Sequence, residues 1–146
     1  MSKILSKIIT GIMALMLIVS AGVKVSANNC GDTYDTAYLD DAGGTTEYYT
    51  KGRYKADYSK GYARNIESSF NGDTYFTLVA SDGDGSYNHY EDFKLFSYGI
   101  EPGERAYLTN YVKESGYNYA AMKVEPGVAS YMETRFAWSP DNCSGY

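Results

Sequence analysis

The sequence predicts an all-β fold: a small antiparallel β-sandwich of about six or seven strands that follows an N-terminal signal peptide. Short runs of alternating, β-branched or aromatic residues recur between turn residues, and strand patterns do not alternate with helix patterns. The 17 tyrosines all lie after Ala27, where they suit half-buried positions in cross-strand pairs. These observations favour one β-sandwich domain over residues 47–146, preceded by an acidic, glycine-rich arm over residues 28–46.

The segment 1–27 is typical of a secretory signal peptide that is removed on export. Lys3 and Lys7 supply the positive charge at its start, residues 8–19 form an apolar segment, and Val-Ser-Ala at residues 25–27 is a small-residue cleavage pattern. The apolar segment is shorter than the roughly 20 residues that a membrane-spanning helix needs. We therefore expect a secreted protein that begins at Asn28 and keeps no membrane anchor.

The charge balance argues against polyanionic partners such as nucleic acid. Three of the 13 lysines and arginines and none of the 18 acidic residues lie in the segment 1–27, so the remaining chain has 10 basic residues and a net charge of −8. Nucleic acid and anionic lipid both favour a basic patch, which this balance does not predict. The nearest candidate is Lys51, Arg53 and Lys55; we expect them on the solvated face of a strand, with a contact site as the alternative.

The two cysteines, Cys30 and Cys143, stand near the two ends of the expected exported chain. Disulfides persist in oxidising compartments, so we expect these cysteines to pair within one chain. In the loop-entropy description, closing a loop of this size stabilises a fold by roughly 4 to 5 kcal/mol. Intermolecular pairing, free thiols and a lipid-modified Cys30 are the alternatives.

The first half of the predicted domain contains strands separated by turn residues. Residues 47–58 alternate between tyrosine or small residues and charged residues, which is typical of a half-buried strand. Apolar residues four apart over 62–70 fit a helix or a strand, and we favour a strand. Residues 74–81 are the most strand-prone run, and Asp-Gly-Asp-Gly at 82–85 predicts a hairpin-type turn before a further strand over 87–98.

The second half of the predicted domain contains two copies of Glu-Pro-Gly, at residues 101–103 and 125–127. Proline fixes φ at the second position of a turn and glycine accepts a positive φ at the third, so each copy predicts a type II turn. We expect strands between and after these turns, over residues 105–112, 119–124 and 128–138.

The last of these strands predicts part of the core. Val128, Met132, Phe136 and Trp138 share one side of the strand, whereas charged residues take the other side. Trp138 is therefore expected to be a buried core residue rather than a platform for a ligand.

No catalytic motif stands out, and we expect a protein that is not an enzyme and binds no cofactor. His89 is the single histidine and falls on a predicted strand, and the chain has no Gly-x-Ser-x-Gly nucleophile motif. Glu91 and Asp92 are adjacent on that strand, so their carboxylates point to opposite faces and do not form an acid–base pair.

A calcium site is a weaker alternative at the glycine-rich turn. Asp82, Asp84 and Ser86 have the spacing that opens a calcium-binding loop. Tyr87 and Phe93 occupy the positions where an EF-hand has glycine and glutamate, so we favour a turn, with an irregular calcium loop as the alternative. One histidine and no Cys-x-x-Cys give zinc no support, and we expect no metal.

Four tyrosines of the 47–58 strand form the candidate binding face: Tyr48, Tyr49, Tyr54 and Tyr58. Tyrosine rings offer flat contact area with a polar tip, which suits a sugar or another protein. The structural alternative is that these rings are divided between the core and cross-strand pairs.

The order of these features resembles small exported proteins of Gram-positive bacteria. The resemblance covers residues 47–141 and is carried by the strand at 74–81, the Glu-Pro-Gly turn at 101–103 and the closing strand Tyr-Met-Glu-Thr-Arg-Phe-Ala-Trp at 131–138. Some such proteins resemble lactococcin-type bacteriocins in being compact exported β-sandwiches. The resemblance implies a role at or near the cell surface and assigns no site residue.

From these observations we expect a secreted, non-enzymatic protein that acts by protein contact at or near the bacterial cell surface, including a bacteriocin-like or immunity role. A carbohydrate-binding module that uses exposed tyrosines is the alternative.

The signal peptide can be tested directly. Because the cleavage pattern ends at Ala27, N-terminal sequencing of the protein recovered from culture medium should begin at Asn28. Mature protein that still carries the segment 1–27 would contradict this prediction.

Overall fold

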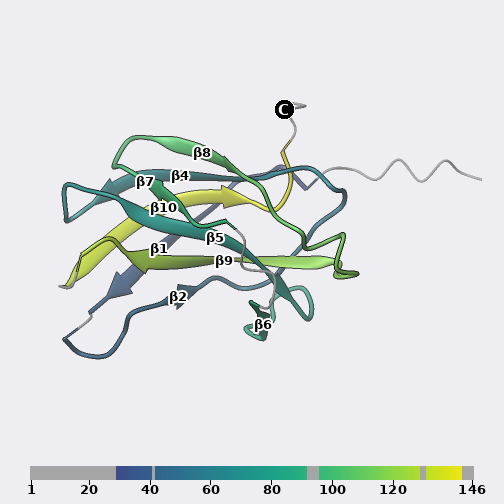
Figure 1. Cartoon of the computed structure of the whole chain (residues 1–146), viewed down its shortest axis with the longest axis horizontal. Helices are drawn as coiled ribbons and strands as arrows, with labels where there is room; N and C mark the ends of the chain where they lie inside the picture. Colours follow the sequence, from purple (N-terminus) through teal and green to yellow (C-terminus); the bar gives the residue numbers. More distant parts are fainter. Residues whose placement is uncertain (1–28, 41, 92–95, 129–130, 143–146) are drawn as a thin grey trace, which may run out of the picture.

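The structure is a computed structural model that describes residues 29–40, 42–91, 96–128 and 131–142. These residues form two antiparallel sheets, one strongly curled, and the predicted all-β, sandwich-like fold is confirmed (Figure 1). Ten strands occur in the described residues, and four of them have only two or three residues. No helix long and apolar enough to cross a membrane occurs in this part of the chain.

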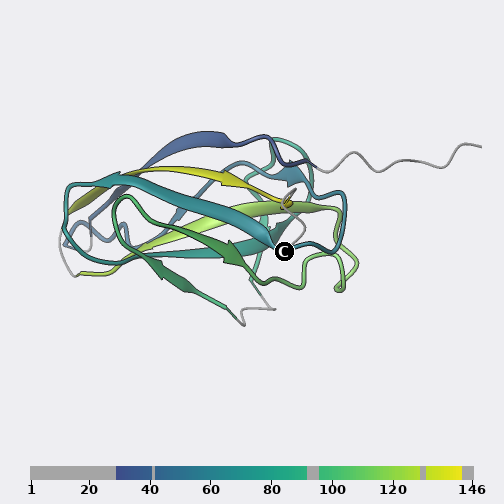
Figure 2. The ribbon, with the colours of Figure 1, turned by 90° about the horizontal axis from the view of Figure 1, so that it is seen from above.

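The first sheet has four strands in the order β1-β10-β4-β8. These strands are β1 (Thr33–Leu39), β10 (Met132–Ser139), β4 (Gly61–Ser68) and β8 (Arg105–Leu108). Strands β1 and β10, from opposite ends of the sequence, pair along the whole of β1 and lie side by side in both views (Figure 1, Figure 2). Residues near the two ends of the domain therefore meet in one sheet.

The second sheet is built on the long pair β5 (Thr74–Ser81) and β9 (Tyr119–Pro126), which pair along their whole length. Short strands complete each side of this pair. β2 (Tyr48–Tyr49) and β3 (Arg53–Tyr54) pair with β9, whereas β6 (His89–Tyr90) and β7 (Tyr98–Ile100) pair with β5.

The core lies between the sheets and consists of alternate residues of the long strands. Phe76 packs edge-on against Phe136, with ring centroids 5.5 Å apart, and the Tyr48 ring also contacts Phe136, at 6.3 Å. Met122, Val124, Met132 and Trp138 are fully buried in the same cluster. The burial predicted for Trp138 is thus confirmed.

The segment expected to form an acidic arm over residues 28–46 contains a sheet strand. Asp35 and Thr36 lie within β1, where Ala37 and Leu39 reach the core and are fully buried. β1 is an edge strand, held in the sheet by its pairing with β10. Its acidic and glycine residues had hidden the alternation of apolar residues at positions 37 and 39.

The single strand predicted over residues 47–58 is wrong, because a close backbone contact interrupts it. Gly52 donates its N–H to the Ser86 carbonyl, and its own carbonyl accepts the N–H of Gly85. A Cβ on residue 52 would collide with Ser81 and Gly83, so only glycine allows the predicted Asp-Gly-Asp-Gly turn to approach so closely. The chain forms β2 before this contact and β3 after it.

The two Glu-Pro-Gly segments have different structures. In the first, Gly103 has a φ of 91° and Glu104 donates its N–H to the Glu101 carbonyl at 3.0 Å, so the predicted type II turn is confirmed. In the second, Pro126 still pairs with Thr74 in the sheet, and the φ of Gly127 is not positive. Glycine is required there because a Cβ would collide with the backbone of residue 73.

The remaining strand predictions succeed where the pattern is long and uninterrupted. Residues 74–81 form β5 and residues 61–68 form β4, which confirms a strand rather than a helix. The continuous strand predicted over 87–98 is wrong: β6 and β7 lie near its two ends, and residues 92–95 lie outside the described residues.

Trp138 should make a large contribution to stability. It is 0% exposed, and truncating a buried tryptophan costs about 3 to 5 kcal/mol, so Trp138→Ala should lower the free energy of unfolding in urea by that amount. Tyr131→Ala is the control, because Tyr131 is 58% exposed just before the same strand and should change stability by less than about 0.5 kcal/mol. Equal stability of the two variants would show that the indole is not a core element.

Candidate functional site

The four-stranded sheet has one face in the core and one face open to solvent. Along β1, Thr33, Asp35, Ala37 and Leu39 stand opposite the inward residues of β10. The alternate residues Tyr34, Thr36 and Tyr38 therefore point outward, and Tyr34 and Tyr38 are 70% and 56% exposed. Two large aromatic side chains thus stand on the open face of an edge strand.

The same face continues across the other three strands. Register places Arg135 opposite Thr36, and Glu67 opposite Arg135. Tyr62 stands opposite Tyr107, and their rings are 5.9 Å apart. We call this surface the tyrosine–arginine face; its members are Tyr34, Thr36, Tyr38, Tyr62, Arg64, Glu67, Arg105, Tyr107, Glu133 and Arg135.

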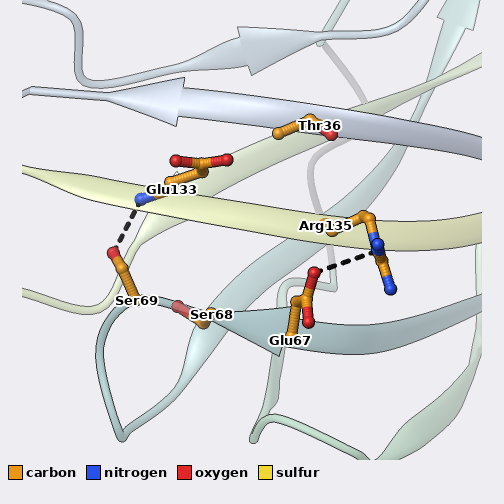
Figure 3. Close-up of a pocket in the computed structure, with 6 residues that line it drawn as sticks. All are labelled: Thr36, Glu67, Ser68, Ser69, Glu133 and Arg135. Atoms are coloured by element: carbon orange, nitrogen blue, oxygen red, sulfur yellow. Dashed lines mark hydrogen bonds and ion pairs between the residues drawn. The ribbon is translucent and has the colours of Figure 1, made fainter.

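A shallow hollow of about 480 Å³ lies within this face (Figure 3). It is lined by Thr36, Glu67, Ser68, Ser69, Glu133 and Arg135. The register of β4 against β10 shifts between Arg135 and Phe136, so the pairing is irregular where the hollow lies. Ser69 accepts the N–H of Glu133 at 2.9 Å and holds the end of β4 beside β10 (Figure 3).

The charges in the hollow are available to a partner. Arg135 Nε lies 3.2 Å from Glu67 Oε1, but the two side chains are 53% and 63% exposed. Such exposed ion pairs contribute little to stability, so exchanging one for a contact with a partner costs little. The face therefore offers arginine and carboxylate groups, hydroxyls and aromatic rings on one side of a hydrogen-bonded sheet.

The four tyrosines of the predicted binding face do not form one surface. Tyr48 points inward to Phe136, and burial together with a hydrogen bond to Asp35 raises the pKa of its phenol far above the ordinary value. Tyr49 follows it in the strand and faces the other way, stacked on the His89 ring at 4.4 Å. The prediction is wrong because adjacent strand residues have opposite faces.

The other two tyrosines lie elsewhere again. Tyr54 packs edge-on against Tyr119 at 5.8 Å, and the ammonium of Lys113 lies over its ring. Tyr58 is 70% exposed beyond β3. The alternative that these rings are divided between the core and cross-strand pairs fits three of the four.

Lys51, Arg53 and Lys55 also separate, so the expected solvated face is wrong for Lys55. Lys51 is exposed and lies over the Tyr87 ring at 5.5 Å. Arg53 is partly buried over the indole of Trp138 at 5.3 Å, and burial lowers its pKa. Lys55 is completely buried.

The Lys55 ammonium is held by three oxygens. Nζ donates to the carbonyls of Ser59 and Pro140 at 2.7 and 2.8 Å and lies 3.1 Å from Asp141 Oδ1. Burial lowers the pKa of Lys55, and the charge of Asp141 opposes that shift. The other carboxylate oxygen, Asp141 Oδ2, accepts the N–H groups of Asn29 and Ala56 at 3.0 and 2.8 Å.

A second buried lysine, Lys123, sits among three carboxylates. Its ammonium contacts Glu47, lies 2.8 Å from Glu125 and 3.5 Å from Glu91, and lies over the Tyr49 ring at 5.9 Å. Burial raises the pKa of Glu91; the Lys123 charge lowers it and the Glu47 charge raises it, and the net shift is upward. The sequence does not reveal this cluster, because its acidic members come from three separate segments.

The calcium candidates Asp82 and Asp84 lie between β5 and β6. No group of three or more histidine, cysteine or acidic side chains in this part of the chain has the arrangement of a metal site. Asp82, the first calcium candidate, accepts a hydrogen bond from Asn88 at 2.9 Å, and its hydrogen bonds to Tyr90 and Asn88 lower its pKa. Asp84 lies in the turn that approaches Gly52.

The predicted disulfide falls partly outside the described residues. Cys30 lines a shallow depression together with Asp141 and Asn142, so it lies near the residues that precede Cys143. Cys143 is not among the described residues, and the pairing stays a prediction.

The fold and the open face define a small, sandwich-like β-protein with a polar and aromatic surface on one sheet. Residues 23–142 match the model of the protein family of unknown function DUF2712, and the chain belongs to that family. No curated protein and no solved structure gives a significant match.

The Glu91 carboxylate should destabilise the fold at neutral pH. Folding raises its pKa, so the ionised form costs the folded state free energy, and this cost disappears at about pH 3, where glutamate is protonated in both states. Glu91→Gln should therefore raise the free energy of unfolding at pH 7 and leave it unchanged at about pH 3. Urea unfolding followed by fluorescence at both pH values measures the effect.

Glu125→Gln is the matched control, since Glu125 lies 2.8 Å from the same ammonium and its removal should lower stability at pH 7. A Glu91→Gln variant that is less stable than the parent at pH 7 would contradict the prediction.

Proposed function

We propose that this chain is an exported, non-enzymatic protein that acts by protein contact at or near a Gram-positive cell surface, in a bacteriocin-like or immunity role, through the tyrosine–arginine face. The observation that carries the proposal is the exposure of Tyr34 and Tyr38 beside Arg135 on the outer face of the sheet. Tyrosine and arginine are among the residue types that contribute most binding energy in protein interfaces.

The composition of the face supports a protein partner. It combines four tyrosines and three arginines with two glutamates, although acidic residues outnumber basic ones by five in the whole sequence. A protein partner can pair with both signs of charge and cover the rings at once, whereas a polyanion would meet Glu67 and Glu133. The signal-peptide pattern of the segment 1–27 supports export.

A carbohydrate ligand is the second candidate, because the hollow presents hydroxyls of Ser68 and Ser69 beside carboxylates and Arg135. Sugar-binding sites place flat rings parallel to a sugar face. The planes of Tyr62 and Tyr107 are inclined at 50°, which favours the protein partner.

The proposal predicts which side chains bind. Purified protein should bind whole Gram-positive cells, and Tyr38→Ala with Arg135→Ala should weaken that binding by at least about tenfold without loss of stability. Tyr58→Ala is the control, since Tyr58 is also well exposed but lies off the face. Fluorescence-detected binding of labelled protein to the cells measures the effect.

Protease treatment of the cells separates the two candidates. Loss of binding after treatment supports a protein partner. Binding that survives protease and is competed by purified wall polysaccharide would favour the carbohydrate ligand instead. If Tyr58→Ala weakened cell binding as much as the variants of Tyr38 and Arg135, the tyrosine–arginine face would not be the binding site for either ligand.

A further inference from the structure

The contact between Lys55 and Asp141 is not explained by a binding role of the tyrosine–arginine face. Both side chains are completely buried, and Nζ lies 3.1 Å from Oδ1. Lys55 follows β3 in the second sheet and Asp141 follows β10 in the first, so the contact joins the two sheets. An amine and a carboxyl group that are in contact and buried from solvent are the two reactants of an amide bond.

We propose that Lys55 and Asp141 condense to an intramolecular isopeptide bond between Nζ and Cγ, with release of one water molecule.

The surroundings of Nζ direct the amine at the carboxyl group. A neutral amine has two N–H groups and one lone pair. The carbonyls of Ser59 and Pro140, at 2.7 and 2.8 Å, accept the two N–H groups, which leaves the lone pair toward Asp141. Burial favours the neutral amine, since it lowers the pKa of Lys55.

The surroundings of Asp141 stabilise the charge that develops during attack. When nitrogen adds to Cγ, one carboxyl oxygen becomes an oxyanion. Oδ2 already accepts two backbone N–H groups, from Asn29 at 3.0 Å and Ala56 at 2.8 Å. This is the donor arrangement of an oxyanion hole, and it also identifies Oδ1, which faces Nζ, as the oxygen that leaves.

Asp57 is placed to relay protons. Its carboxylate lies close enough to the Asp141 carboxyl group and to the Lys55 ammonium for both to lower its pKa. Burial raises the pKa of Asp57, but the hydrogen bonds from Ser59 and the Lys55 charge outweigh burial and lower it overall, so Asp57 is ionised and its oxygens can accept a proton.

The step balances from the ion pair. The Lys55 ammonium loses two protons as the Nζ–Cγ bond forms, the Cγ–Oδ1 bond breaks, and Oδ1 leaves with those two protons as water. One proton passes directly from the ammonium to Oδ1, 3.1 Å away, which gives the neutral amine. Asp57 accepts the second proton from nitrogen and returns it to Oδ1, so it ends unchanged. No oxidant, cofactor or activated co-reactant is needed.

Lys123 provides an internal comparison. Its carboxylate neighbours keep 25% to 40% of their side chains exposed, whereas Asp141 is 0% exposed. Solvent reaches the carboxylates of the Lys123 cluster, where an ion pair is the stable state, whereas the side chains of Lys55 and Asp141 are both 0% exposed. We therefore expect condensation at Lys55 alone.

Intact-mass measurement of the folded, purified and chemically reduced chain tests the proposal. The mass should be lower than that of the unmodified chain by one water molecule, and peptide mapping should find the peptides of Lys55 and Asp141 joined. An unmodified mass would overturn the proposal, as would a water loss confined to a single peptide, which indicates a cyclised aspartate or asparagine.

Variants assign the roles. Asp57→Asn keeps the shape of the relay but removes its base, and should restore the unmodified mass while the chain stays folded. Lys55→Arg should do the same, and Lys123→Arg, the matched control, should retain the water loss. Persistence of the joined peptides in Asp57→Asn would remove Asp57 from the reaction.

Discussion

The contacts of the Asp141 carboxylate connect the two sheets, and the arrangement of the sheets depends on them. Its two oxygens bind the Lys55 ammonium and the N–H groups of Asn29 and Ala56, so segments far apart in the sequence converge on one side chain. A buried charge is tolerated only when it is paired and hydrogen-bonded, and here the partners come from the segment that precedes β1 and from the segment after β3. The free energy that pairs these charges therefore also fixes one end of the sandwich.

Arg53 connects the residues around Asp141 to the core. Its guanidinium donates to the Trp138 carbonyl at 3.2 Å and to Asn29 and the Gly31 carbonyl at 3.0 and 2.7 Å, and it lies over the Trp138 ring. The start of the described chain is thus bound to both sheets before β1 begins. Because β1 pairs with β10 along its whole length, this anchoring also holds Tyr34 and Tyr38 in place on the open face.

Sequence patterns predicted the parts of the fold that depend on local preference. β5 is rich in β-branched and aromatic residues and β10 alternates; in the turn at Gly103, proline fixes φ at the second position and glycine accepts a positive φ at the third. The break at Gly52 depends instead on the distant turn at 82–85, and the burial of Lys55 depends on segments that local alternation does not contain. In β1 only Tyr38 lies between apolar residues, Ala37 and Leu39, whereas Tyr34 lies between Thr33 and Asp35, so the alternation was too short to reveal the open face.

The geometry of the hollow follows from one irregularity of pairing. Between Arg135 and Phe136 the register of β4 changes, so Asn65 stands opposite Phe136 in the core while Glu67 stands opposite Arg135 on the surface, with Ile66 between them. A regular ladder would have placed residue 66 opposite Arg135 and removed the carboxylate from the hollow. The ion pair in the hollow and the packing of Phe136 beneath it therefore depend on the same extra residue, which links the candidate binding surface to the core.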